Sequence, residues 1–401
     1  MNAPSVNTSF FRNFSALFSG LLIVQAINFL FSLLLPRFFQ PSAFAEFGIF
    51  TSIVFIFMEV VNAKLDIAVM LGKDETEARK ILHAAFTVAI LAFCLMTLAQ
   101  LLFLFFVPKI YFLLPLTILL YGIHQPVLVW LNKQENYKVI NLFRIIQVLS
   151  TSLVTLGLGV LHIEHALVFG FIAGLFMATA YALFYAVPVF NLNTTREIWK
   201  RYDQFPKYGT WSSLLNNFSR NSIPVILSAF FSPQMVGFYA YATRLLNAPT
   251  GMYTSALGQV YFKKASELSQ ADLIKATRRI IVFSCSISIL PTLFILIFGK
   301  ELFYLLFSGE WLEAGKIAQY LIVWYFLGVI TSPVSILLDI KNKLKFEFGF
   351  NAFLFVIRIA AIAVGGYLND FYLAMLLYAL TGVAMNLLLL YYINFHLLKH
   401  D

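Results

Sequence analysis

Residues 81–107 read ILHAAFTVAILAFCLMTLAQLLFLFFV and contain no Asp, Glu, Lys or Arg. A helix of about 20 apolar residues is long enough to cross the hydrocarbon core of a bilayer, so this stretch predicts a membrane-spanning helix. The whole chain has the same character: of its 401 residues, 60% are apolar and only 12% are charged. Soluble domains carry about 25% charged residues. The composition therefore predicts an all-α polytopic membrane protein and excludes a soluble domain, a disordered chain or a disulfide scaffold.

Polar or proline-containing breaks separate this stretch from further apolar stretches of similar length, such as the charged run at residues 73–77. Together they predict about twelve spans, with little chain left for a soluble domain. The spans are expected near residues 15–36, 43–63, 81–107, 111–131, 139–161, 164–187, 209–231, 234–260, 279–299, 315–338, 347–367 and 371–396.

The net charge of +9 comes from 28 Lys and Arg residues against 19 Asp and Glu residues. When the predicted loops are assigned alternately to the two sides of the membrane, 20 basic residues fall on the side of the N-terminus and four on the other side. Basic residues collect in cytoplasmic loops, so both termini are expected to be cytoplasmic. The positive charge is explained by topology, and no nucleic acid partner is expected.

Landmarks recur in the same order in the two halves of the sequence. The run Phe38-Phe39-Gln40-Pro41 is echoed by Phe230-Phe231-Ser232-Pro233, and each is followed by a glycine and aromatic residues, at Gly48 and Gly237. We therefore predict two six-helix bundles, at residues 1–190 and 191–401, related as parallel repeats. Such repeats are typical of transporters that handle the substrate between their halves.

Polar side chains within the predicted spans are the candidate site residues. An arginine in the middle of a membrane helix is costly unless it faces a cavity or a partner, and a guanidinium suits phosphate oxygens. Arg220 and Arg244 are therefore the leading candidates for an anionic head group. The other residues that share polar stripes and are expected to line a substrate cavity are Gln25, Asn28, Arg144, Asn217, Asn221, Tyr241 and Asn247.

Two acids, Glu59 within the predicted span 43–63 and Asp66 just after it, are candidates for a coupling-ion or proton site. The alternative is that Arg144 or Arg244 forms helix-to-helix ion pairs with these acids. No nucleotide-binding, metal-binding or cofactor motif is present, and no predicted outer loop is long enough for a catalytic site. We therefore expect no metal, no cofactor and no catalytic residues, and a protein that is not an enzyme.

Several motifs resemble the polysaccharide-biosynthesis flippases, the Wzx-type O-antigen and exopolysaccharide exporters of the multidrug/oligosaccharidyl-lipid/polysaccharide (MOP) superfamily. The resemblance rests on runs distributed over the whole chain. They are Pro36–Pro41 with Phe47-Gly48, Ile223–Leu227 with Phe230–Pro233, Val236–Arg244, Ala256–Tyr261, Ile297–Leu302, and Leu306–Trp311.

This resemblance implies a MATE-like fold of two bundles in a V shape around a central cavity. It implies movement of an undecaprenyl-diphosphate-linked oligosaccharide, by alternating access, from the inner to the outer leaflet of the bacterial inner membrane. The implied partners are that glycan, membrane lipids, and polysaccharide polymerase and chain-length machinery. One alternative is a cation-coupled drug exporter of the same superfamily, which would have an acid-dominated cavity. Another is a membrane glycosyltransferase or polymerase, which would need a long outer loop.

Overall fold

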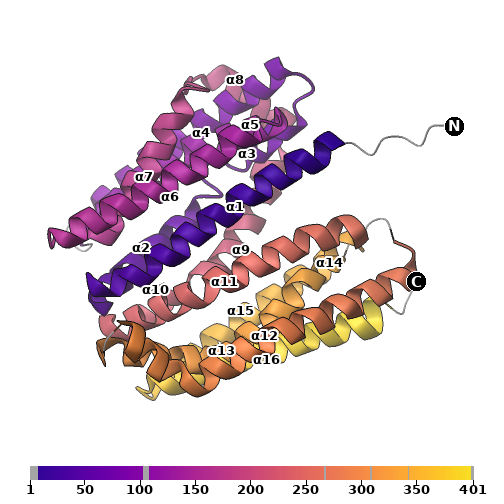
Figure 1. The fold of residues 1–401 in the computed structure, drawn as a ribbon. Coiled ribbons are helices and arrows are strands. Elements are labelled where there is room, and N and C mark those ends of the chain that lie inside the picture. The colour runs from indigo at the N-terminus through magenta and orange to yellow at the C-terminus, as the bar shows by residue number, and fades with distance from the viewer. Residues whose placement is uncertain (1–7, 103–107, 266–267, 308, 342, 399–401) are drawn as a thin grey trace. The chain divides into compact units, whose positions relative to one another are not determined.

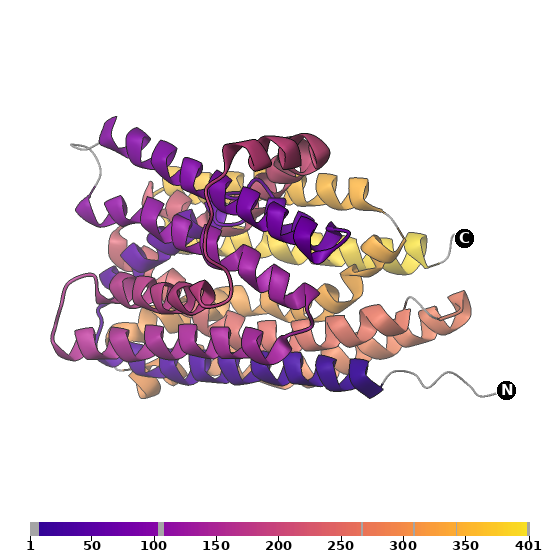
Figure 2. The same cartoon turned by 90° about the horizontal axis from the view of Figure 1, so that it is seen from above.

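The computed structural model describes residues 8–102, 108–265, 268–307, 309–341 and 343–398, and these residues form helices, turns and short connections without any β-strand (Figure 1). Nine of the helices in this part of the chain are long and apolar enough to span a membrane. Within each of the two units described below, the long helices run roughly along one direction (Figure 2). The predicted all-α polytopic membrane fold is confirmed.

The chain forms two compact units. The first unit contains residues 1–31 and 49–222, and the second contains residues 32–48 and 223–401. The segment 32–48, which includes the turn after the first long helix, therefore packs with the C-terminal residues. Residues 191–222, placed by the sequence in the second half, pack with the first unit. The repeat boundary at residues 190 and 191 stays a prediction.

The first unit is built mainly from helices that follow one another in the chain. Its elements are most of α1 (Thr8–Leu34), most of α2 (Pro41–Phe57), α3 (Leu65–Ala68), η2 (Val69–Leu71), α4 (Glu75–Leu102), η3 (Lys109–Leu113), α5 (Leu114–Lys133), α6 (Tyr137–Val160), α7 (Ala166–Leu183), α8 (Leu192–Arg201), η4 (Phe205–Gly209) and α9 (Thr210–Asn221).

The second unit begins with the last turn of α1, η1 (Leu35–Arg37) and the start of α2. Its remaining elements are α10 (Ile223–Ser228), α11 (Pro233–Ala265), α12 (Gln270–Phe307), η5 (Gly309–Trp311), α13 (Leu312–Ser335), α14 (Leu337–Ile340), α15 (Leu344–Tyr367), α16 (Phe371–Tyr392) and η6 (Ile393–Leu397).

Several breaks predicted from the sequence coincide with helix ends in the structure. The charged run at residues 73–77 contains the start of α4, where the Asp74 carboxylate accepts a hydrogen bond from the Glu77 backbone amide at 2.7 Å, as expected of a helix N-cap. The break between α6 and α7 turns on His162 and His165, whose φ angles are 54° and 61°. The end of the predicted span 81–107 lies outside the described residues.

Three predicted spans differ from the nine long apolar helices, and they are the three that carry many polar residues. Predicted span 43–63 is too long, because α2 ends at Phe57 and a turn follows. Predicted span 234–260 is contained in the longer α11. Predicted span 209–231 is broken at Ser222 into α9 and α10, because Pro224 has no amide hydrogen to donate to the preceding turn and its ring is crowded by the backbone there.

Close packing of small residues joins α6 to α7 in the first unit. Gly170 and Gly174 of α7 are one turn apart, and a Cβ atom on either would overlap the hydroxyl group of Thr155 or Thr151 of α6. Such spacing lets two membrane helices approach closely. Together with the buried cluster around Ile81, this packing gives the first unit a core independent of the second.

Candidate functional site

Glu59 lies at the centre of a polar cluster in the first unit. Its Oε2 atom accepts hydrogen bonds from Lys64 Nζ at 3.1 Å and from Asn217 Nδ2 at 3.2 Å. Asn221 donates to the Asn217 backbone carbonyl at 3.0 Å, and the exposed Arg220 interacts electrostatically with Glu59. The structure thus brings Glu59 together with three of the predicted site residues on α9.

The turn after α2 positions this cluster. Ala63 and Lys64 have φ angles of 49° and 60°, a left-handed conformation that non-glycine residues rarely adopt. The buried Asn62 holds the turn, because its side-chain amide donates to the carbonyls of Ala85 at 3.1 Å and Gly122 at 2.7 Å. Lys64 is consequently directed back at Glu59, and its side chain is only 9% exposed. Lys64 was not predicted as a site residue, because it follows the predicted span 43–63 and counts there as a loop charge.

Asp66 is buried in α3, outside the nine candidate spans, and its Oδ1 atom has no hydrogen-bond partner. Burial raises the pKa of its carboxyl group, while Lys64 opposes that rise and Glu59 adds to it. A buried carboxyl group with a raised pKa gains or loses its proton at a pH closer to neutral than an exposed one does. This supports the expectation of a proton site at Asp66 more than at Glu59, whose carboxylate is paired.

Asp66→Asn is expected to raise the free energy of unfolding at pH 7 by about 1 kcal/mol or more, because the variant removes an incompletely bonded buried carboxylate. The pKa of Asp66 is higher in the folded state, so the folded protein binds more protons above the ordinary carboxyl pKa. Its stability therefore falls as the pH rises through that window. The variant should lose this fall in a series of denaturation curves from pH 4 to 7. An identical pH dependence in both proteins would contradict this assignment.

Arg244 is held by uncharged groups in the second unit. Its Nε atom donates to the Ser32 hydroxyl at 2.9 Å, and its guanidinium carbon lies 5.5 Å from the centre of the Phe47 ring. No acidic side chain in the described residues forms an ion pair with Arg244 or with Arg220. Within the first unit, neither Glu59 nor Asp66 forms an ion pair with Arg144 among the described residues.

Tyr241 lies one turn before Arg244 and is fully buried. Its hydroxyl donates to the Ser32 carbonyl at 3.0 Å, and its ring contacts Trp311 at 4.6 Å between centroids. Tyr241 was predicted to line a cavity, but in this structure it is a packing residue that anchors α11. Both Tyr241 and Arg244 bond to Ser32, so this serine, which shares the polar stripe of Gln25 and Asn28, is a further positioning residue.

The remaining predicted site residues are spread over several helices. Gln25 and Asn28 are half-buried on α1, and Asn247 is exposed on α11 with a hydrogen bond to Tyr325. Arg144 on α6 has one terminal guanidinium nitrogen that is buried without a hydrogen-bond partner. That orphaned donor is consistent with a ligand contact, but the structure does not join it to the Glu59 cluster.

A second arginine in the C-terminal unit deserves comparison with Arg244. The guanidinium carbon of Arg358 on α15 lies 4.7 Å from the Trp324 ring centre and 5.2 Å from the Tyr378 ring centre. Its Nε atom is buried without a hydrogen bond. The signal in the sequence was a charge within an apolar span, but its aromatic partners come from α13 and α16 and could not be identified from spacing.

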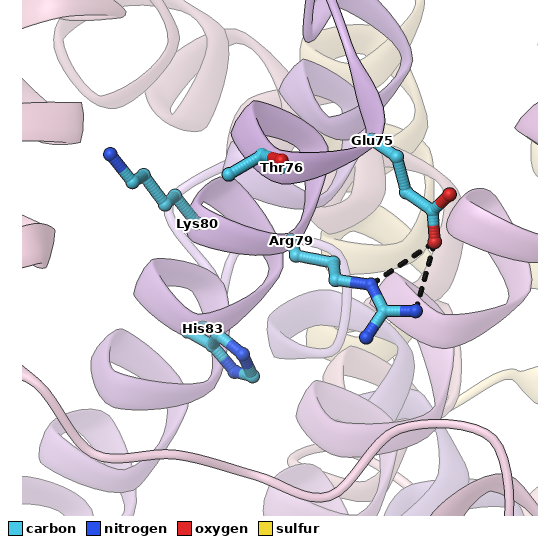
Figure 3. A pocket seen from close by; sticks show the side chains of 5 residues that line it. All are labelled: Glu75, Thr76, Arg79, Lys80 and His83. Atoms are coloured by element: carbon cyan, nitrogen blue, oxygen red, sulfur yellow. Dashed lines mark hydrogen bonds and ion pairs between the residues drawn. The ribbon is translucent and has the colours of Figure 1, made fainter.

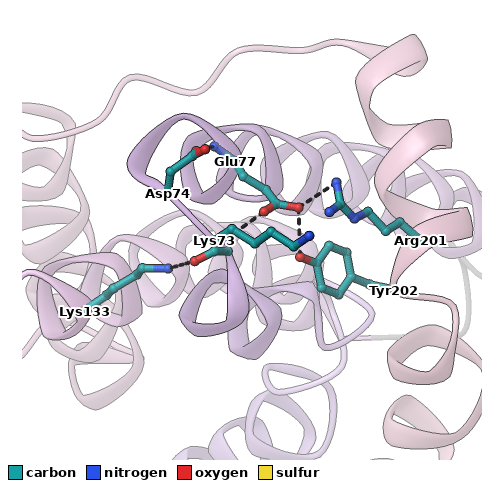
Figure 4. A network of polar contacts seen from close by, with 7 residues as sticks. Lys73, Asp74, Glu77, Lys133, Arg201 and Tyr202 are labelled. Atoms are coloured by element: carbon teal, nitrogen blue, oxygen red, sulfur yellow. Dashed lines mark hydrogen bonds and ion pairs between the residues drawn. The ribbon is translucent and has the colours of Figure 1, made fainter.

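A network of polar contacts fixes α8 to α4 (Figure 4). The Glu77 carboxylate pairs with Arg201 at 2.7 Å and accepts hydrogen bonds from the Tyr202 hydroxyl at 3.1 Å and the Lys73 amide at 2.8 Å. In the neighbouring turn, Lys133 Nζ donates to the carbonyl of Gly72. Asp74 and Glu77 have the spacing of a capping box, which was the available sequence signal.

No group of three or more His, Cys, Asp or Glu side chains suited to a metal ion occurs among the described residues. A surface pocket is lined by residues of the first turns of α4, which are Glu75, Thr76, Arg79, Lys80 and His83 (Figure 3). Within it, Arg79 is paired with Glu75 at 2.8 Å, while Lys80 extends away from that pair.

The fold and these helices define a multi-pass membrane protein with the transporter fold of the MOP superfamily. The model of a family described as "Polysaccharide biosynthesis protein" matches residues 34–316, well over half of the chain. The chain therefore belongs to this polysaccharide-biosynthesis family. No curated protein sequence matches the chain.

Solved structures agree on the fold. A Lipid II flippase, MurJ, in an inward closed conformation is 14% identical with a TM-score of 0.76, and the match covers 94% of this chain and 87% of MurJ. An inward-facing MATE family multidrug resistance transporter of the MOP superfamily is 14% identical with a TM-score of 0.72, covering 94% of this chain and 95% of the transporter. A MOP superfamily transporter from Pyrococcus furiosus is 13% identical with a TM-score of 0.58, covering 97% and 95%.

Proposed function

We propose that the protein is a flippase for an undecaprenyl-diphosphate-linked oligosaccharide, an O-antigen or exopolysaccharide repeat unit. It moves this substrate by alternating access from the cytoplasmic to the outer leaflet of the bacterial inner membrane. The family membership supports a role in polysaccharide biosynthesis, and the fold shared with transporters, including a protein described as a Lipid II flippase, supports movement across a membrane.

The observation that carries the proposal is that two arginines in helices of a membrane protein, Arg220 and Arg244, form no ion pair within hydrogen-bonding distance among the described residues. Glu59 interacts with Arg220 only electrostatically. Arg244 is bonded through Nε to Ser32, which leaves the two terminal nitrogens of its guanidinium for another acceptor. Arg220 is exposed on a helix whose neighbouring polar residues, Asn217 and Asn221, are amides. Guanidinium groups bind phosphate oxygens with paired, charge-assisted hydrogen bonds, so a diphosphate or an acidic sugar is the matching ligand class.

The shape of such a substrate fits a membrane protein with polar stripes. A polyprenyl tail can stay in the lipid while only the polar head group crosses, so the protein needs to supply polar and charged groups for the head group alone. Non-helical and charged groups are tolerated at membrane depth where they line a wet cavity. The proposed cavity residues are Arg220, Arg244, Asn217, Asn221, Asn247, Arg144, Asn28 and Gln25, with Tyr241 and Ser32 supporting Arg244.

The same proposal includes roles for two acidic residues, the orientation of the chain in the membrane, and the partners of the protein. Asp66 is the proposed proton site, and Glu59 with Lys64 orients Asn217. Both termini are placed in the cytoplasm, as the distribution of basic residues predicts. The protein acts without catalytic residues or a cofactor, and it delivers its substrate to a polysaccharide polymerase and its chain-length machinery.

Deletion of the gene in its native host tests the proposal. Surface polysaccharide should be lost, and an undecaprenyl-diphosphate-linked unit should accumulate on the inner leaflet; its sugars would identify the substrate. A plasmid copy of the gene should restore the surface polysaccharide. Normal surface polysaccharide in the deletion strain would contradict the proposal, and loss of drug efflux instead would favour the cation-coupled exporter that shares this fold.

A further inference from the structure

The helix α8 lies alongside the beginning of α4 in the opposite direction. The Asn191 amide, at the N-cap of α8, donates to the Thr87 hydroxyl at 3.1 Å, while Arg201 at the other end of α8 pairs with Glu77 at 2.7 Å. The two contacts lie ten residues apart from each other on each helix, which is about 15 Å along a helix axis. Each residue of α8 therefore lies beside an identified part of α4, and its position along that membrane-spanning helix is known.

Apolar side chains are exposed where the chain enters α8. The segment 184–192, here called the apolar strap, presents Phe184, which is 84% exposed, together with Val187, Phe190 and Leu192. It ends beside Thr87, which lies in the continuous apolar part of α4 that begins at Ile81. In a membrane, the apolar part of α4 lies among the acyl chains. Exposed aromatic and aliphatic side chains beside Thr87 are therefore suited to contact with acyl chains.

Basic side chains are found on the first turns of α4 and on the part of α8 that lies beside them. Lys80 lies in the pocket of Figure 3, and Arg196 and Lys200 lie on the exposed side of α8. In the described residues, the ion pairs at this end join Arg79 to Glu75 and Arg201 to Glu77, and none involves these three cations. Glu197 partly offsets them, so an excess of positive charge remains beside the apolar strap.

We propose that Lys80, Arg196 and Lys200, here called the basic belt, bind the head groups of anionic phospholipids, with the apolar strap in the acyl region. Trp199, which is 39% exposed between Arg196 and Lys200 on the same helix, lies at the boundary. Tryptophan concentrates at membrane–water interfaces, and basic residues beside a membrane helix attract anionic lipids. Because α8 is fixed to α4 by Glu77, the belt holds the first unit at one depth in that leaflet.

Tryptophan quenching in full-length protein tests this proposal. The protein is reconstituted in vesicles that contain brominated phosphatidylglycerol or brominated phosphatidylcholine, and the signal of Trp199 is taken as the difference from Trp199→Phe. Phosphatidylglycerol should quench it more strongly. Each basic residue contributes about a fivefold preference for anionic lipid. The variant Lys80→Gln/Arg196→Gln/Lys200→Gln should therefore lose the preference, whereas Lys109→Gln, on η3 beyond the far end of α4, should keep it.

Equal quenching by the two lipids in the unaltered protein, or no quenching of Trp199 by either, would overturn the proposal. An unchanged preference in the triple variant would overturn it as well. Circular dichroism and gel filtration verify that the variants are folded, and Lys80→Arg/Lys200→Arg, which keeps the charge, should retain the preference. A lost preference in that conservative variant would also count against a head-group site.

Discussion

Replacement of both Arg220 and Arg244 by Gln is expected to reduce polysaccharide export by about tenfold or more without reducing the amount of protein in the membrane. A hydrogen bond to a charged group contributes about 1.5–3 kcal/mol, and about 1.4 kcal/mol corresponds to a tenfold change in affinity. Glutamine keeps a hydrogen-bond donor but removes the positive charge and the paired geometry. The measurement is surface polysaccharide per cell in a deletion strain that carries each variant.

The exposed Arg37 of η1 provides a matched control, since Arg37→Gln removes the same charge from a position outside the site. It should leave export unchanged. Ser32→Ala, which removes the hydroxyl that accepts from Arg244 Nε, should give a smaller loss than Arg244→Gln. If the double arginine variant exported normally, neither arginine would belong to the substrate site.

Gly237→Ala is expected to destabilise the second unit strongly. A Cβ atom at Gly237 of α11 would overlap the backbone carbonyl of Pro41, the first residue of α2. A backbone group cannot move aside as a flexible side chain can, so the two helices must separate. Overpacking of this kind costs about 1–3 kcal/mol. Unfolding in increasing dodecyl sulfate, followed by circular dichroism, should show a lower midpoint.

Gly251→Ala on the same helix is the matched control. A Cβ atom there meets no other atom within 4 Å. Alanine favours helix over glycine by about 1 kcal/mol, so this variant should be as stable as the unaltered protein or more stable. Equal stability of the two variants would show that Gly237 is not a close-packing position and would contradict the described contact between α11 and α2.

Local patterns were sufficient for most of the boundaries of the nine long apolar helices in the described residues. The acidic and basic residues at 73–77 mark the start of α4 because a helix N-cap depends on residues a few positions apart. The end of α2 at Phe57 could not be predicted in the same way. The turn that ends it depends on Asn62, whose hydrogen-bond acceptors, Ala85 and Gly122, lie on two other helices.

In the candidate site, too, features set by residues close in sequence could be predicted, and features set by contacts with other helices could not. Helical spacing grouped Asn217, Arg220 and Asn221 on one helix, as α9 has them, but the predicted span 209–231 continued past the break at Ser222. The contact of Asn217 with Glu59 and of Arg244 with Ser32 joins residues 158 and 212 positions apart. Long-range contacts of this kind depend on tertiary packing, so composition can show that a charge needs a partner but not which partner it has.

The central claim is that this protein moves a lipid-linked glycan from one leaflet to the other. The most direct measurement uses proteoliposomes that contain the purified protein and the undecaprenyl-diphosphate-linked glycan from the deletion strain. A membrane-impermeant reagent that oxidises sugars then reports the fraction of head groups on the outer surface over time. With the unaltered protein, head groups from both leaflets should become accessible. With Arg220→Gln/Arg244→Gln, this should happen much more slowly. Accessibility that stays at the level of protein-free vesicles with the unaltered protein would contradict the central claim.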